Sequence, residues 1–260
     1  MSTLTLEATD ILRWTVSLVW PFVRISAMLL VMPVFGARQI NARVRLGLAL
    51  LLAWMIAPQL PEAPAIDPLS VGGLVVAVEQ VLIGISMGFV LTLVFSAINQ
   101  AGEAIALSMG LGFASAVDPV GGVQVPMISQ YLSIIATLIF LAMNGHLVLF
   151  ELLLRSFETF PIGLDGPDNE DLWFIASFGS QMFAGAILIA LPAVASLLLI
   201  NLAMGVVTRA APQLNIFAVG FPITILAGFL IILLTLPSLT ARIGDFLFTA
   251  LPLIERVARI

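Results

Sequence analysis

The amino-acid sequence predicts an all-helical integral membrane protein with about six long helices. Of the 260 residues, 61% are hydrophobic and only 10% are charged, whereas soluble domains carry about 25% charged residues. So few charged side chains, most of them gathered in short segments, could not cover the surface of a soluble fold of this length. Six apolar runs between these segments supply the predicted helices.

The apolar runs are taken in chain order. They lie at residues 11–35, 46–57, 74–98, 127–150, 172–207 and 216–236. Four of them reach the roughly 17 to 25 residues that cross a bilayer. The second is short unless the side chains of Arg43 and Arg45 extend its reach to the membrane surface. The fourth is interrupted at Asn144, Gly145 and His146.

The charges in the loops give a partial orientation. Residues 38–45 hold three arginines and no acid, which predicts a cytoplasmic loop. The acidic segments at 58–68 and 165–171 are expected outside, and Arg209 returns to the cytoplasmic side. The alternation weakens at 99–126, which has no arginine, and at the C-terminus, where three arginines fall on the outer side: Arg242, Arg256 and Arg259. We therefore expect that the helices do not all cross the bilayer one by one.

Several kinds of site are excluded by residue type. Cysteine and lysine are absent, and His146 is the only histidine, so disulfides, thiolate sites and multi-histidine metal sites are excluded. The net charge of −5 argues against nucleic acid as a partner. Ser108, Ser115 and Ser129 have no histidine or lysine at a catalytic spacing. We expect a protein that is not an enzyme and has no cofactor.

Charged residues inside the apolar runs need compensation. Arg13, Arg24 and Glu79 lie within such runs, where an ionised group costs about 2.5 to 3.5 kcal/mol on insertion scales. One interpretation is a proton or ion relay. The other, which we favour because the charges are isolated, is a set of interhelical pairs facing other protein. Gly84 and Gly88, four residues apart, indicate close approach of another helix.

The segment at 108–123, SMGLGFASAVDPVGGV, is unusual. Its glycines and the Asp-Pro step disfavour a long helix, yet it is too apolar for a solvated loop. Irregular backbone at membrane depth persists only inside protein or along a cavity. We interpret it as a flexible apolar segment enclosed by other helices, and the alternative is a re-entrant turn packed within its own subunit. The residues of interest are Met109, Gly110, Leu111, Gly112, Phe113, Val117, Gly121 and Gly122.

Four stretches of the chain are distinctive. They are RAAPQLNIFAVGFPITILAG at 209–228, PVFGARQINARVRLGLAL at 33–50, GLGFASAVDPVGGV at 110–123 and NGHLVLFELLLRSF at 144–157. Together they resemble the FliR/SctT family of flagellar and virulence secretion systems. They occur in the family's order, and the resemblance covers nearly the whole chain. The stretch at 191–217 also resembles the helical hairpin of the small partner FliQ, and the earlier part is similar to FliP.

The resemblance implies an arrangement of helical hairpins, with a FliP-like part at 1–171 and a FliQ-like hairpin and tail at 172–260. It implies a core subunit of the flagellar type III export gate in the bacterial inner membrane, at the flagellar basal body. The implied partners are FliP, FliQ, FlhA and FlhB counterparts, membrane lipid, and unfolded flagellar proteins in transit. In this family the assembled helices form a cone raised largely out of the bilayer plane.

The resemblance also implies roles for particular residues. The segment at 108–123 matches the family's central plug, which seals the pore at rest. A cytoplasmic turn is expected at Arg209, Pro212, Gln213 and Asn215. Arg24 and Glu79 are expected at contacts with neighbouring subunits. The alternative function is a secondary transporter with an intramembrane proton or ion relay, although such transporters usually show internal repeats.

Overall fold

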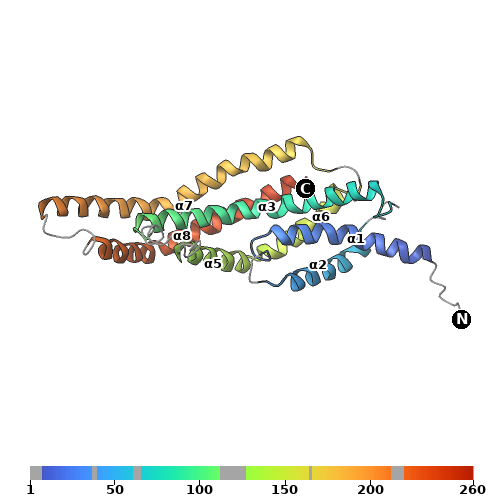
Figure 1. Cartoon of the computed structure of the whole chain (residues 1–260), viewed down its shortest axis with the longest axis horizontal. Coiled ribbons are helices and arrows are strands. Elements are labelled where there is room, and N and C mark those ends of the chain that lie inside the picture. The colour runs from blue at the N-terminus through green and yellow to red at the C-terminus, as the bar shows by residue number, and fades with distance from the viewer. Residues whose placement is uncertain are drawn as a thin grey trace. The chain divides into compact units, whose positions relative to one another are not determined.

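The computed structural model shows a chain made of helices (Figure 1). It describes residues 8–36, 40–60, 66–111, 127–163, 166–211 and 220–259, with side chains from residue 17 onward. The elements are α1 (Ala8–Val31), α2 (Ala42–Ile56), the short 3-10 helix η1 (Ala57–Gln59), α3 (Val71–Ser108), α5 (Met127–Ala142), α6 (Gly145–Thr159), α7 (Asn169–Ala210) and α8 (Phe221–Val257). Those ranges contain no strand, and the predicted all-α fold is confirmed.

The apolar run at 127–150 forms two helices instead of one, so the described chain has seven α-helices where about six were predicted. Asn144 adopts a left-handed conformation, with φ at 56°, which asparagine tolerates better than most residues. Helices α5 and α6 are bent by 65° at this break. Hydropathy counts apolar residues without regard to backbone direction, and it therefore joined the two helices into one run.

Three of the described helices are long and apolar enough to cross a membrane. These are α3, α7 and α8, and the bent pair of α5 and α6 adds a fourth if it counts as one span. The longest, α7, has 42 residues and therefore extends about 63 Å at 1.5 Å per residue. That is roughly twice the 30 Å hydrocarbon core of a bilayer. The long helices are thus longer than the hydrocarbon core of a bilayer is thick.

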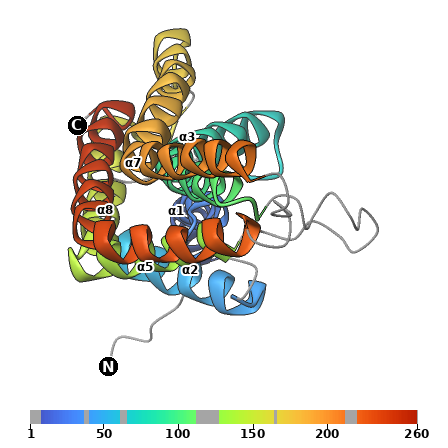
Figure 2. The same ribbon diagram turned by 90° about the vertical axis from the view of Figure 1, so that its left-hand side faces the viewer.

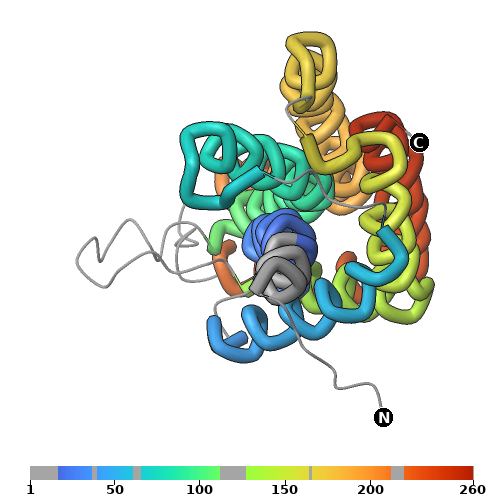
Figure 3. Tube along the Cα trace, turned by 90° about the vertical axis from the view of Figure 1, so that its right-hand side faces the viewer, coloured from blue at the N-terminus to red at the C-terminus, as the bar shows by residue number. Residues whose placement is uncertain are grey.

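One compact unit takes in Met1–Leu93, Asn144–Phe178 and Thr249–Ile260. In it α1 lies between α2 and the beginning of α3 (Figure 3). Helix α6 packs against α1 and α3. The core consists of large side chains from α1, α3 and α6 that are almost wholly buried: Trp20, Ile25, Met28, Leu29, Met87, Leu91, Leu153 and Phe157.

The approach of α3 to α1 depends on two glycines. A Cβ atom at Gly84 would collide with the carbonyl oxygen of Arg24, and one at Gly88 would lie 2.8 Å from the carbonyl oxygen of Met28. Any larger side chain would push the helices apart at both points. The predicted role of this glycine pair in close helix packing is confirmed.

The other compact unit takes in Val94–Met143 and Gly179–Phe248. In it α5 packs on the end of α3, where Ser129 Oγ donates to the Asn99 carbonyl oxygen at 2.9 Å. Helix α5 also runs beside α8 (Figure 2). Serine hydroxyls that donate to backbone carbonyls allow helices to approach closely without leaving a polar group unpaired.

The three long helices differ in how much of their apolar surface the chain itself covers. In the most apolar 18-residue window, 61% of α3 is buried, but only 33% of α7 and 17% of α8. Several large side chains of α8 are more than half exposed: Leu226, Phe229, Leu230, Leu233 and Leu234. Helices α7 and α8 therefore present apolar faces that need lipid or other helices to cover them.

Candidate functional site

The end of α3 carries the first residues of the segment interpreted as a plug. Met109 is fully buried and Leu111 is half-buried. Gly112, Phe113, Val117, Gly121 and Gly122 lie outside the described residues, so their role stays a prediction. What the structure does describe is how the chain leaves α3 toward that segment.

Helix α3 ends in a Schellman motif built on Gly110. This glycine has a φ of 83°, a conformation that costs L side chains energy and glycine almost nothing. Its N–H donates to the Leu107 carbonyl oxygen and that of Leu111 donates to the Ala106 carbonyl oxygen, both at 3.0 Å. These two bonds define the motif. The carbonyl groups of Ser108 and Met109 are left without partners inside the helix.

Side chains from α7 and α8 meet these two carbonyl groups. Asn201 Nδ2 of α7 donates to the Ser108 oxygen at 3.1 Å. Thr224 Oγ1 of α8 lies 3.4 Å from the Met109 oxygen, and its shorter bond, at 2.9 Å, goes to the Phe221 oxygen of its own helix. Asn201 is therefore the principal donor, and Thr224 a weaker second contact.

The side chain of Met109 fills a notch in α8 that Gly228 creates. A Cβ atom at Gly228 would lie 2.5 Å from Met109 Cγ, 2.6 Å from Cε and 2.8 Å from Sδ. Phe221, one helical turn before Thr224, covers Gly110, where a Cβ would lie 3.1 Å from its ring. The last turn of α3 is thus held by hydrogen bonds on its carbonyl groups and by packing on its final side chain.

Arg24 is wholly buried in the unit formed by α1, α6 and the beginning of α3. Its Nε donates to Gln80 Oε1, one terminal nitrogen to the Ser156 carbonyl oxygen and the other to the Phe160 carbonyl oxygen, each at 2.8 Å. The guanidinium also lies 4.0 Å from the centroid of the Phe157 ring. Arg24 therefore joins α1, α3 and α6 through neutral acceptors, at the negative end of the α6 dipole.

The sequence identified Arg24 but not the residues that compensate it. Glu79, the acidic residue noted in the sequence, is half-buried and packs against Gly166, where a Cβ would lie 3.1 Å from Glu79 Cγ. The neighbouring Gln80, only 1% exposed, is the partner of Arg24. A polar amide in an otherwise apolar run was the signal that could have revealed it. The predicted contact of Arg24 and Glu79 with neighbouring subunits stays a prediction, and Arg24 needs no such contact to be satisfied.

The predicted cytoplasmic turn is described only at its start. Arg209 is exposed in the last turn of α7, where a positive charge is stabilised by the helix dipole. Pro212, Gln213 and Asn215 lie outside the described residues. Their placement on the cytoplasmic side stays a prediction.

Two arginines near the C-terminus contact the segment around the start of α7, in the unit that contains α6. Arg259 forms ion pairs with Asp168 and, at 2.7 Å, with Asp171, and Arg256 lies 4.2 Å over the Phe174 ring. The backbone N–H of Asp171 and the Arg259 guanidinium together hold the pKa of Asp168 below its ordinary value. Arg259 and the acidic segment were predicted on the same side, and the structure brings these two into contact.

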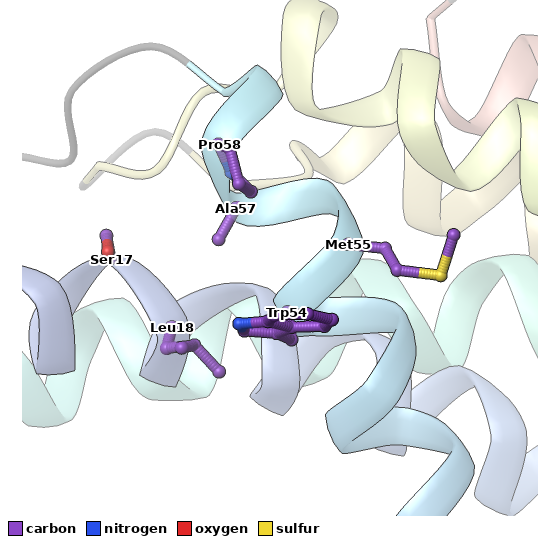
Figure 4. A pocket seen from close by; sticks show the side chains of 6 residues that line it. All are labelled: Ser17, Leu18, Trp54, Met55, Ala57 and Pro58. Carbon is purple, nitrogen blue, oxygen red and sulfur yellow. The ribbon is translucent and has the colours of Figure 1, made fainter.

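A hollow of about 390 Å³ lies where α1 meets the end of α2 (Figure 4). Trp54 of α2, which is 63% exposed, stands beside Leu18 of α1, and Ala57 and Pro58 lie next to it. The described lining has no ionisable side chain. Nor do the described residues contain a group of three His, Asp or Glu side chains that could hold a metal ion. This hollow is suited to apolar contact and offers no acid or base for chemistry.

Comparison with known proteins gives one consistent result. The family described as "Bacterial export proteins, family 1" matches residues 15–250. The flagellar biosynthetic protein FliR of Pectobacterium carotovorum subsp. carotovorum is 42% identical over 234 residues, which is 90% of this chain and 89% of that protein. FliR of Escherichia coli strain K12 is 39% identical over 92% of this chain and 90% of its own length. FliR of Bacillus subtilis strain 168 is 33% identical over 82% of this chain and 83% of its own.

Proposed function

Because this chain belongs to the FliR family of bacterial export proteins, we propose that it is a core subunit of the flagellar type III protein export gate. With counterparts of FliP and FliQ it forms the channel through which unfolded flagellar proteins leave the cytoplasm. The gate lies in the bacterial inner membrane at the flagellar basal body, next to FlhA and FlhB counterparts. Within the chain, residues 1–171 are the FliP-like part and 172–260 the FliQ-like hairpin and tail.

One observation above all supports an assembled gate. The most apolar window of α8 is only 17% buried and that of α7 only 33%. A transporter that works alone would have to turn most of these faces toward lipid. Helices of about 56 to 63 Å, at 1.5 Å per residue, are too long for lipid to cover over their full length. Neighbouring helices of the same kind cover such faces over any length.

The proposed plug meets a physical requirement of such a channel. A pore wide enough for an unfolded chain must not leak ions while idle, and an apolar constriction excludes water. The segment at 108–123 supplies Leu111, Phe113 and Val117 for this purpose, whereas the side chain of Met109 is buried against α8 at Gly228. Each buried side chain contributes at most about 1.5 to 3 kcal/mol, so a passing substrate that makes equivalent contacts displaces them.

Arg24 argues against the rival assignment of an ion-relay transporter. A relay requires groups that exchange protons or ions along a path. The acceptors of Arg24 are an amide, two carbonyl oxygens and a hydroxyl, none of which changes protonation near neutral pH. The buried charge is thus explained by helix packing.

Assembly is tested by expression with and without partners. Expressed alone, the chain is expected to aggregate or be degraded, whereas co-expression with its FliP and FliQ counterparts yields one large complex. Size-exclusion chromatography of detergent extracts measures this. A well-behaved active monomer would contradict the gate assignment and favour a transporter.

The plug is tested by shortening it. Removal of residues 110–116 is expected to leave the complex assembled but to make membranes permeable to small ions. Gly112→Asp places a charge in the seal and is expected to impair gating. Ion flux is measured in vesicles that hold equal amounts of complex. If the shortened variant assembles and its vesicles stay as tight as wild type, the segment is only a packed turn.

A further inference from the structure

We infer that Asn201, Thr224 and Gly228 are positioning residues that clasp the last turn of α3 and so set where the plug begins. We call these three residues the clasp. The inference rests on the proposed function, because the segment that follows Gly110 is the proposed plug. The clasp itself stands on described contacts of α3, α7 and α8.

The hydrogen bonds of the clasp satisfy carbonyl groups at the end of α3 that the helix itself leaves unpaired. A Schellman motif satisfies the carbonyl groups two and three positions before its Ccap residue, here those of Leu107 and Ala106. The carbonyl groups of Ser108 and Met109 then remain, and at an isolated helix end water would bond them. Here α7 and α8 approach them instead. The end of α3 is therefore capped by two helices that are distant in sequence.

The packing part of the clasp depends on the absence of a side chain at position 228. Three side-chain atoms of Met109 lie within 2.8 Å of the place where a Cβ of residue 228 would stand, which is nearer than real Cβ contacts allow. Met109 is 0% exposed, so its side chain is enclosed by other parts of the protein. Alanine at 228 would therefore displace the Met109 side chain from the notch.

Together these contacts set the direction in which the chain leaves α3. The left-handed turn at Gly110 fixes the direction of Leu111, and Asn201 and the notch at Gly228 hold that turn in place. A joint movement of α7 and α8 away from the end of α3 would withdraw the donor and the notch together. The clasp therefore couples the proposed FliQ-like hairpin to the first residues of the proposed plug.

The test uses the complex with FliP and FliQ counterparts and a reporter at Leu111. Because the chain has no cysteine, Leu111→Cys gives one labelling site in this subunit, and its rate of reaction with a maleimide is measured. Gly228→Ala and Asn201→Leu are each expected to raise that rate about fivefold, the population change that loss of one hydrogen bond or a comparable contact produces. Gly205→Ala on α7, where a Cβ would meet nothing within 4 Å, is the matched control.

A second-site change separates the clasp from general damage to α8. In a background that already carries Met109→Ala, the three clashing atoms are gone, so Gly228→Ala is expected to change the rate no further. Asn201→Leu keeps its effect in that background, because its bond goes to Ser108. An equal effect of Gly228→Ala in both backgrounds would place the damage elsewhere and overturn the notch.

The outcomes distinguish this inference from the gate assignment. Unchanged labelling in Gly228→Ala and Asn201→Leu overturns the clasp, while the gate still stands on co-assembly and on the leak of the shortened variant. Raised labelling together with ion leak supports the positioning role. Raised labelling without leak, in vesicles where the shortened variant does leak, means that the clasp holds α3 but does not position the seal, and overturns the inference.

Discussion

Replacement of Arg24 by methionine tests what holds α1, α3 and α6 together. Methionine is long and flexible enough to keep contact with the Phe157 ring, but it removes every N–H donor. Gln80 Oε1 and the Phe160 carbonyl oxygen then lose their donor. The Ser156 carbonyl oxygen still accepts from the Phe160 N–H at 3.0 Å, so two buried acceptors become unsatisfied.

Two such acceptors cost about 2 to 6 kcal/mol, at about 1 to 3 kcal/mol each. Part of this is offset, because the native state no longer has to keep a cation away from water. We therefore expect the free energy of opening this unit to fall by about 3 kcal/mol, which lies in the lower half of that range. This corresponds to an acceleration of about 100-fold in local opening, which hydrogen exchange of the Phe160 amide in the purified complex measures.

A double-mutant cycle decides whether the bond to Gln80 carries this effect. Gln80→Leu leaves the buried cation one acceptor short and is expected to cost about 1.5 to 3 kcal/mol. The Arg24→Met/Gln80→Leu variant is expected to cost less than the sum of the single changes, by about 1 kcal/mol or more. Effects that add within about 0.5 kcal/mol, or an unchanged exchange rate in Arg24→Met, would refute the reasoning.

Three further predictions concern other parts of the chain. The Asp171 N–H and the Arg259 guanidinium hold the pKa of Asp168 below its ordinary value, so the stability that these contacts contribute is present above the unfolded pKa and is lost as the pH falls through the folded pKa. Hydrogen exchange at the end of α8 measures this loss, and Asp168→Asn removes the pH step. Gly84→Ala is expected to reduce recovery of the co-expressed complex, because its Cβ meets the backbone of α1. The control Gly47→Ala, with open space around it, is expected to assemble normally. Equal recoveries of the two variants would contradict this. A single cysteine at Asn215 is expected to react with a maleimide from the cytoplasmic side, and labelling only from the periplasmic side would refute that placement.

The sequence predicted the helices well, because long apolar runs leave few alternatives. Each of the six runs lies largely within a helix or, at 127–150, within a pair of helices. Even the break was marked in advance by Asn144, Gly145 and His146. What the pattern could not supply was the geometry of the break, since the left-handed conformation of Asn144 and the 65° bend depend on what packs around them.

The contacts of the candidate site could not be predicted from the sequence for a physical reason. Met109 and Gly228 are separated by more than a hundred residues, and nothing in either segment records the other. Burial costs an ionised group more than a neutral amide, so Glu79 stood out in the sequence and Gln80 did not. By contrast, the backbone freedom expected of Gly110 is a local property, and it appears in the structure as a left-handed turn at the end of α3.

The unit that holds Arg24 is assembled from three separate stretches of the chain, and this affects how the protein is made. Thr159 Oγ1 donates to the Ala258 carbonyl oxygen at 2.5 Å, across 99 residues of sequence. The intervening stretch Gly179–Phe248, about 70 residues, takes roughly 4 to 14 s to synthesise at 5 to 20 residues per second. During those seconds the end of α6 lacks the hydrogen bond from Thr159 to Ala258, so this unit is completed only after the rest of the chain has been made.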